Sequence, residues 1–547
     1  MAREQKGEAT PEQLRDLRLY IKRSWAVLER NLGEVLAAIT DEKVTRSEES
    51  KPILYVSRKE DLAAIEARLK SVCSAEHLGQ IEIRHLPLSW RDVEPHGLLY
   101  LPKPYVVPGG SFNEMYGWDS YFITRGLLRD DEVEFARDMA ANLFYQVDKY
   151  GTVLNANRTY YLTRSQPPFL SRMALAVFYC TKDREWLSRA APAIEAYYLF
   201  WTKGPHFVKE FGLSRYYDFG DAPAPEVLVH ERDHRGLTHY DRVKKFYRTH
   251  GREIKDYDLS LFYDLANDSL TPLFYRADRA MRESGHDPSN RFGAFNIGVL
   301  EILPVDLNCL LYQMELDLAE IAAIRNRKSE AALWEGRAGS RAALINELMW
   351  DEGRGLYFDY DYNRRERRIY PYVTTFFPMW VGLASRAQAA RIVENLPLFE
   401  RAGGLQTSTH ISGNQWDAPM GWAPMQLIAD EGLRRYGYEA QADRTAINFL
   451  SMILKEFLEH GVIVEKYNVA ERESSVPQEI KYGYSTNQVG FGWTNAAFAL
   501  MYATLSASER RQVRRLCGVG TSASSSSKAG DDLVSSTLKG GPEPRPL

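Results

Sequence analysis

Apolar side chains recur every three or four residues along much of the chain, which is the spacing of one face of an α-helix. Three such stripes stand out after residue 123. They are Leu187, Ala190, Ile194, Tyr197 and Trp201; Leu307, Leu311, Met314, Leu318 and Ile321; and Ile447, Leu450, Leu454 and Phe457. The pattern predicts roughly a dozen helices of ordinary length and an all-α fold.

The segments between these helices are long and rich in Gly, Pro and Asp. Loops are predicted over 202–260, 286–304, 352–372, 403–423 and 461–490. Loops of this length in a compact domain are usually functional or disordered. Helical hairpins whose loops gather at one end suggest an (α/α)6 toroid over residues 101–517.

The two ends of the chain differ from this main domain. Within residues 1–100, the spacing predicts a helix in 11–39 with Leu14, Leu17, Ile21, Trp25 and Leu28 on one face. Short strands are expected at Ile53–Val56 and Ile81–Ile83, around a helix over Lys59–Val72. We interpret residues 1–100 as an N-terminal extension that caps the main domain. Residues 518–547 are rich in Ser, Gly and Pro and are predicted to be disordered.

Composition excludes several classes of protein. Of 547 residues, 44% are apolar and 26% charged, as in ordinary soluble proteins, and the net charge of −4 gives no attraction for nucleic acid or an anionic membrane. Four scattered cysteines without a CxxC pair predict neither a disulfide framework nor a zinc site, and Cys180 and Cys309 are predicted core thiols. No secretory signal or membrane span is visible. We expect a cytoplasmic monomer.

Two stretches combine tryptophan with acids, glycines and prolines. The first is Pro108–Phe122, in which Trp118 precedes Asp119. The second is Asn414–Gln426, which contains Trp416, Asp417 and Trp422. Buried tryptophans are usually core residues. A flat ring beside fixed acceptors also suits a sugar, which has apolar C–H faces and a rim of hydroxyl groups.

These stretches resemble the two signature segments of the trehalases, glycoside hydrolase family 37. Further segments resemble that family in the same order, over Leu99–Thr504. They are Leu154–Phe169, Glu283–Asp287, Val305–Asn308, Glu465–Tyr467 and Gly490–Asn495. The resemblance implies the same (α/α)6 toroid and the hydrolysis of a disaccharide without a cofactor or metal.

The resemblance also implies residue roles. Asp287 matches the general acid and Glu465 the general base of a single-step hydrolysis with inversion. Their carboxyl groups are then expected about 6.5–9.5 Å apart, with room for a water molecule. From the residues alone, a helix cap or a surface ion pair is the more frequent role for such acids. The positions that match substrate contacts are Trp118, Asp119, Asn155, Arg164, Ser165, Gln166 and Gly285.

The chain departs from the family pattern at several positions. Ser111 and Ala224 stand where the family has arginines that hold the disaccharide, and His286 replaces the usual tryptophan. The glycine-rich lid is replaced by Glu479–Tyr484. Compensating cations are sought among Lys481, Arg215, Arg232 and His230.

Three functions therefore compete. The first is an α,α-trehalase that releases two glucose molecules. The second is a glycosidase of the same fold that acts on another α-glycoside, because two substrate arginines are missing. The third is a toroid that binds sugar without turnover. Nucleotide-dependent transfer is disfavoured, because the chain has no Gly-rich phosphate loop with its lysine.

Overall fold

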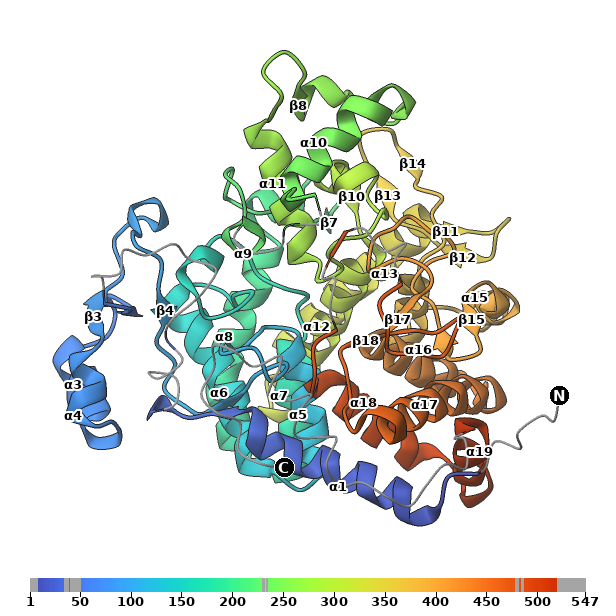
Figure 1. Ribbon diagram of the computed structural model, residues 1–547, viewed down its shortest axis with the longest axis horizontal. Helices are drawn as coiled ribbons and strands as arrows, with labels where there is room; N and C mark the ends of the chain where they lie inside the picture. Colours follow the sequence, from blue (N-terminus) through green and yellow to red (C-terminus); the bar gives the residue numbers. More distant parts are fainter. Residues whose placement is uncertain are drawn as a thin grey trace.

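The structure is a computed structural model that describes residues 8–33, 39, 51–228, 232, 235–477, 482–483 and 487–518. Of the predicted tail, Gly518 lies within this part of the chain, and the rest lies outside it. Helices dominate, and the strands are short (Figure 1).

Helices of the main domain form a closed inner ring. Among the described residues its members are α5 (Asp119–Arg129), α7 (Leu170–Thr181), α12 (Val305–Ile324), α14 (Phe377–Trp380), α16 (Ala423–Arg435) and α18 (Gly492–Thr504). Each packs against the next, and α18 contacts α5, which closes the ring. The predicted all-α toroid is therefore confirmed.

A second set of helices surrounds this ring. Its members are α6 (Val133–Tyr150), α8 (Arg184–Trp201), α13 (Lys328–Met349), α15 (Arg386–Glu394) and α17 (Glu439–His460). The predicted stripes on α8 and α12 are buried throughout, and that on α17 is buried except for the half-buried Phe457. Capping residues mark the helix ends: Asp183 accepts a hydrogen bond from the Trp186 amide at the start of α8, and α17 ends at Gly461 with φ of 73°.

The first helix of the chain belongs to the same packed unit. Helix α1 (Pro11–Leu28) lies along the lower edge of Figure 1 and packs against α18 and α17. All five residues of its predicted stripe are buried. Asn495 Nδ2 donates to Ser24 Oγ (2.8 Å), which ties α1 directly to α18. The helix stops at Leu28, short of the predicted range, because β1 (Glu29–Arg30) then pairs with β5 (Tyr105–Val106). The C-terminal helix α19 (Ala507–Cys517) packs against α17.

A small α/β lobe stands out at the left of Figure 1. Its parallel sheet has the order β3 (Glu82–His85), β2 (Ile53–Val56), β4 (Leu98–Leu99). Helices α3 (Leu62–Val72) and α4 (Ala75–Gly79) connect β2 to β3. Both predicted strands and the helix between them are present, although β3 covers Glu82–His85 rather than Ile81–Ile83, and α3 begins after its N-cap Asp61 rather than at Lys59.

The remaining strands form small sheets in the connections. They are β6 (Phe207–Val208) with β7 (Leu213–Ser214), β8 (Tyr263–Asp264) with β9 (Ser269–Leu270), β10 (Ile302–Leu303) with β13 (Tyr360–Asp361) and β14 (Glu366–Arg367), β11 (Trp350–Asp351) with β12 (Leu356–Tyr357), β15 (Glu400–Arg401) with β16 (Gly404–Leu405), and β17 (Met420–Trp422) with β18 (Lys466–Asn468). Strands β17 and β18 join two predicted loops, with Trp422 opposite Lys466.

Two expectations from the sequence were wrong, one about a loop and one about a thiol. The predicted loop 202–260 contains α9 (Pro225–Leu228) and α10 (His239–His250), before α11 (Pro272–Glu283). Helix α10 forms because Thr238 and Asp241 make a capping box and because one face, including Tyr240 and Val243, is buried. Cys180 is exposed, since it lies in the last turn of α7, whereas Cys309 is buried as predicted and all four thiols are free.

Candidate active site

Asp287 follows directly after helix α11. Gly285 makes the turn with φ of +73°, and a Cβ there would lie 2.8 Å from two ring carbons of Trp118. A glycine is therefore required both by the backbone conformation and by the tryptophan packed on it. The carbonyl oxygen of Asp287 accepts a hydrogen bond from Gln415 Nε2 (2.6 Å). Its side chain is 31% exposed, so the carboxyl group is open on one side.

A buried arginine contacts the Asp287 carboxyl group. Arg282 Nη1 lies 3.4 Å from Asp287 Oδ2, and the same guanidinium pairs with Asp278 (Nη2 to Oδ1, 3.1 Å). Burial raises the pKa of Asp287 to about 6, while the positive charges of Arg282 and Arg164 act in the opposite direction. A carboxyl group with this pKa is able to give up a proton near neutral pH.

Glu465 lies just before strand β18 and is held by its main chain. Its amide donates to Gln488 O (3.0 Å), and its carbonyl oxygen accepts from Trp493 Nε1 (3.1 Å) at the start of α18. Its side chain is 7% exposed, and Oε2 forms an ion pair with Lys466 Nζ at 3.2 Å. The main-chain contacts therefore fix the backbone of Glu465, and the ion pair with Lys466 holds its carboxylate.

Two features bring the two predicted catalytic acids together. Lys466, the partner of Glu465, donates to Gln415 Oε1 (3.0 Å), and the amide nitrogen of that same Gln415 binds the Asp287 carbonyl. The buried Asp119 is the second feature. Burial raises its pKa well above the usual range, and the negative charges of Glu465 and Asp287 raise it further. Asp119 therefore lies near both acids, and the expected separation of about 6.5–9.5 Å between the acids stays a prediction.

Aromatic rings surround these carboxyl groups. Trp118 lies 5.9 Å from Trp416 and 5.8 Å from Trp493, centroid to centroid. Trp416 stacks on Trp422 at 3.9 Å and 4°, and Lys466 Nζ lies 5.4 Å from the Trp422 ring centre. All four tryptophans are buried. The structure thus gathers Trp118, Trp416 and Trp422, and their contact with substrate stays a prediction.

His286 belongs to this aromatic cluster. Its ring lies 5.6 Å from Trp118 and 4.8 Å from Trp416, and Arg291 Nη1 lies 3.1 Å from its Nδ1. Burial and the Arg291 charge hold the pKa of His286 well below its usual range, so the imidazole is neutral. This histidine fills the place of the usual tryptophan as a neutral ring.

Arg164 is the centre of a buried polar network. Its Nε donates to Asn155 Oδ1 (2.7 Å), its Nη2 binds Glu226 Oε1, and its Nη1 lies 3.7 Å from Asp218 Oδ2. Burial opposes ionisation of Glu226, but Arg164, Arg282 and other cations lower its pKa to about 2. Glu226 is therefore an anion that holds Arg164 in place.

The residues that follow Arg164 are held by neighbouring segments. The amide of Ser165 donates to Glu283 Oε1 (2.9 Å), at the end of α11. Gln166 Oε1 accepts from the Trp118 amide (3.0 Å), at the start of α5. These bonds connect three of the segments that resemble the trehalases. Asn157 Nδ2 donates to Leu99 O, and Arg158 Nε donates to Glu114 Oε1. These contacts agree with a structural role for both residues.

Asp417 is fully buried and has partners on both oxygens. Its Oδ2 accepts from Ser412 Oγ (2.6 Å) and the Asn290 amide (2.7 Å), and its Oδ1 accepts from Tyr370 OH (2.9 Å). Burial raises the pKa of this carboxyl group to about 6. Asp417 joins three of the predicted loops, so it positions the walls of the site.

The two positions that lack the family arginines have other contacts. The Ser111 hydroxyl binds Gln488 Oε1, beside the segment that holds Glu465. Ala224 is buried, and its amide donates to Tyr240 OH (3.0 Å). Both positions therefore lie in segments that reach the candidate site.

Of the four cations considered as replacements, the structure describes Arg215 and Arg232, and the hydrogen bonds of both go to groups other than the two acids. Arg215 binds Pro205 O (2.8 Å), Leu300 O and Tyr362 OH, and Arg232 Nη1 donates to Gly236 O (3.0 Å). Lys481, His230 and the lid residue Glu479 lie outside the described residues. Residues that reasoning from the sequence missed are Arg282, Gln415 and Lys466. Of these, Gln415 and Lys466 lay within segments already singled out.

Comparisons with known proteins agree with this arrangement. A family model described as Trehalase matches residues 15–505. The chain belongs to the trehalase family. Within that family it is 37% identical over 471 residues to the cytosolic neutral trehalase of Emericella nidulans, covering 79% of this chain and 61% of that protein. It is 38% identical over 444 residues to the cytosolic neutral trehalase of Saccharomyces cerevisiae, covering 75% and 58%.

A solved structure shows the same trehalase fold. The neutral trehalase of Saccharomyces cerevisiae superposes with a TM-score of 0.76 at 32% sequence identity, covering 92% of this chain and 96% of that one. The matched part of this chain spans about 60% of the length of the two relatives named above. Among the described residues, no helix of this trehalase-family chain is long and apolar enough to span a bilayer.

Proposed function

We propose that this chain hydrolyses trehalose to two glucose molecules, with Asp287 as general acid and Glu465 as general base. The observation that carries the proposal is the hydrogen-bonded path from Asp287 through Gln415 and Lys466 to Glu465. It brings two acids that are far apart in the sequence into one site, around the buried Asp119.

The proposed reaction requires one protonated acid and one ionised acid. The protonated Asp287 gives its proton to the glycosidic oxygen as the bond from that oxygen to the anomeric carbon breaks. The Glu465 carboxylate removes a proton from a water molecule, which attacks the same carbon from the opposite face. One glucose therefore leaves as the β anomer and the other as the α anomer. The cycle ends with Asp287 ionised and Glu465 protonated, and exchange with solvent restores both.

Buried polar atoms without a hydrogen bond support a ligand with many hydroxyl groups. Glu226 Oε2 has no hydrogen-bond partner among the described residues, and Asp218 Oδ2 has only ion-pair contacts, with Arg279 Nε (3.2 Å) and Arg164 Nη1 (3.7 Å). Buried polar groups in native proteins almost always have partners. Sugar hydroxyls are able to supply them, because each both donates and accepts. We also propose that Arg282 provides one of the guanidinium groups that Ser111 and Ala224 leave absent, since it is the arginine beside Asp287.

An assay of the purified chain tests the substrate and the stereochemistry together. Trehalose and a panel of other α-linked glucosides and mannosides are each followed by proton NMR of the anomeric signals. We expect trehalose to be cleaved, with α- and β-glucose appearing initially in equal amounts. Cleavage of another glycoside but not trehalose would favour the second function considered above. Saturable binding without turnover would favour a silent sugar-binding toroid.

Replacement of Arg282 by Gln is expected to shift the alkaline limb of the pH profile of kcat/KM, which is the part where activity falls as pH rises. The acid form of Asp287 is active, so activity falls as pH rises through its pKa of about 6. The Arg282 charge favours the ionised form, and its removal is expected to raise that pKa by about one unit or more. The limb then moves to higher pH.

Pairs of variants control this experiment. Arg282→Lys keeps the charge and is expected to keep the limb near its original position. Arg276→Gln removes an arginine from the same helix that pairs with Asp221 instead (3.4 Å), and it should leave the pH profile unchanged. A limb that stays in place in Arg282→Gln would mean that another group controls it.

We also propose a cytoplasmic location, because the relatives named above are described as cytosolic. Fractionation of cells that express the native gene tests this location.

A further inference from the structure

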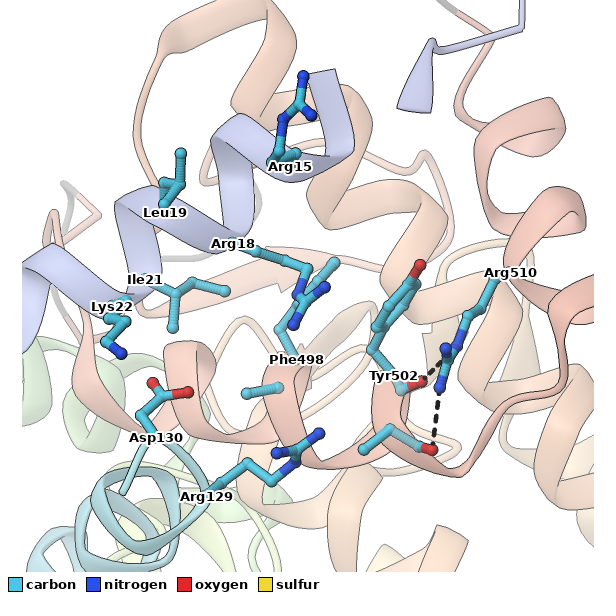
Figure 2. Close-up of a pocket in the computed structure, with 12 residues that line it drawn as sticks. Arg15, Arg18, Leu19, Ile21, Lys22, Arg129, Asp130, Phe498, Tyr502 and Arg510 are labelled. Carbon is cyan, nitrogen blue, oxygen red and sulfur yellow. Dashed lines mark hydrogen bonds between the residues drawn. The ribbon is translucent and has the colours of Figure 1, made fainter. Parts of the chain in front are cut away.

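A cavity lies on the far side of the inner ring from the candidate catalytic residues. It has a volume of about 280 Å³ and lies between α1, the end of α5, and helices α18 and α19 (Figure 2). Its lining consists of basic, aromatic and small apolar side chains and one acid. They are Arg15, Arg18, Leu19, Ile21, Lys22, Arg129, Asp130, Phe498, Ala499, Tyr502, Ala503 and Arg510.

The cavity concentrates positive charge on a protein whose net charge is negative. Five basic side chains line it, against one carboxylate, in a chain with a net charge of −4. Within the described ranges, no carboxylate forms an ion pair with Arg18, Lys22 or Arg129. Figure 2 shows Arg18 and Lys22 reaching down from α1 toward the level of Arg129, whereas Arg15 points away. Unpaired guanidinium groups around one hollow suit a phosphate group.

Flat apolar surface lies beside these charges. The Tyr502 ring has the Arg510 guanidinium 4.8 Å from its centre and the Arg18 guanidinium 5.8 Å from its centre. Arg510 is fixed by hydrogen bonds to Tyr502 O and Ala503 O, both 3.2 Å. Phe498 lies one helical turn before Tyr502 on α18 and stacks with it at 5.8 Å and 10°. Phe498 is fully buried and Tyr502 is half-buried, so Tyr502 is the ring that is able to meet the C–H face of a sugar.

The single acid narrows the choice of ligand. Asp130 Oδ2 accepts from Trp25 Nε1 (2.7 Å), and the carboxylate has further lone pairs. It would repel a ligand that is only anionic, but it is able to accept hydrogen bonds from hydroxyl groups. We propose that this cavity binds the phosphate ester of a sugar, with the phosphate at Arg18, Lys22 and Arg129 and a sugar hydroxyl at Asp130. Its volume of about 280 Å³ lies just below the usual range of ligand sites, about 300–1,000 Å³, which suits a ligand as small as a single hexose phosphate.

This site is distinct from the catalytic one. Helix α5 begins with Asp119, which lies near both catalytic acids, and ends at Arg129 in the cavity. Helix α18 likewise begins beside Trp493, which binds the Glu465 carbonyl, and carries Tyr502 near its end. These helices have 11 and 13 residues, so about 16–20 Å separates their ends. The two sites occupy opposite ends of the same helices.

Calorimetric titration of the full chain tests the proposal, with glucose 6-phosphate, inorganic phosphate and glucose as probes. We expect glucose 6-phosphate to bind more tightly than phosphate, and glucose not to bind at the cavity. Arg18→Gln and Arg129→Gln should each weaken binding about tenfold. Both side chains are exposed, so the fold should persist, which circular dichroism checks. Arg386→Gln removes an exposed arginine on α15 and should leave the affinity unchanged.

Several outcomes of the same titration would overturn the proposal. Equal affinity in wild type, Arg18→Gln and Arg129→Gln would show that glucose 6-phosphate binds elsewhere. No binding to the wild-type chain would also reject it, whether or not trehalose is cleaved. If inorganic phosphate binds as tightly as glucose 6-phosphate, the cavity does not recognise the sugar, and that part of the proposal is rejected. Saturating trehalose, added to the Glu465→Gln variant so that it is not consumed, should leave the affinity for glucose 6-phosphate unchanged. Competition between the two would place glucose 6-phosphate in the catalytic site instead.

Discussion

The Asp287→Asn variant is expected to hydrolyse trehalose about 10²–10⁴-fold more slowly than the wild-type chain. An amide keeps the shape of the side chain and its place beside Arg282 but has no acidic proton to transfer. Burial keeps the pKa of Asp287 near 6, so the wild-type group is a proton donor at mildly acidic pH. The measurement is kcat/KM for trehalose at pH 6, together with the melting temperature.

The choice of leaving group separates the loss of an acid from general damage. Fluoride leaves without proton transfer, so Asp287→Asn should retain much more of its activity on α-glucosyl fluoride than on trehalose. Asp430→Asn is the matched control, because burial also raises the pKa of Asp430 to about 6, on α16. It should behave as wild type on both substrates. Asp287→Asn rates close to wild type on trehalose would reject its role as the acid.

The Glu465→Gln variant is expected to lose activity by a similar factor, about 10²–10⁴, on both substrates. Its carboxylate is needed to remove a proton from the attacking water, whichever group leaves. The amide can still contact Lys466, so the main-chain contacts of this segment should persist. The measurement is kcat on trehalose and on α-glucosyl fluoride, with circular dichroism as the check of folding.

An adjacent acid–lysine pair on α17 provides the control for Glu465. Lys455 Nζ lies 2.7 Å from Glu456 Oε1 on α17, which reproduces the ion pair of Lys466 with Glu465. Glu456 reaches the Glu465 segment only indirectly, because its Oε2 accepts from Ser474, whose carbonyl oxygen accepts from Asn487. Glu456→Gln is expected to leave kcat unchanged, although it lowers stability. If Glu465→Gln kept its activity on α-glucosyl fluoride but not on trehalose, its role would be that of an acid and not a base.

The helices of the toroid were predictable because their buried faces repeat with the helical period. The stripes on α1, α8 and α12 are all buried, and each needed no information beyond the spacing of apolar residues. Helix α10 was missed because its buried face includes His239, Tyr240 and Tyr247, which read as polar or ambiguous in the sequence. Ring closure depends on contacts between α18 and α5, and no local pattern reports such contacts.

Residues of the candidate site that belong to sequence motifs were predictable. Residues that only tertiary contacts bring to the site were not. Asp287 and Glu465 were proposed from the family resemblance, and their roles await the variants above. Arg282 is one of 69 basic residues, and only the turn at Gly285 returns the chain so that its guanidinium meets Asp287. The sequence analysis singled out Trp416 and not Gln415, which precedes it. The Gln415 side chain joins two distant segments, and no pattern in a single sequence indicates such a contact.

The contact between the last inner helix and the first has a consequence for synthesis. Trp493 on α18 must reach Trp118 and Glu465, and Asn495 must reach Ser24, which is 471 positions earlier in the chain. A nascent chain emerging from the ribosome therefore exposes the apolar flanks of α5 and α1 until nearly all of the toroid has been made. Such a protein is expected to depend on chaperones during translation more than a bundle of neighbouring hairpins would.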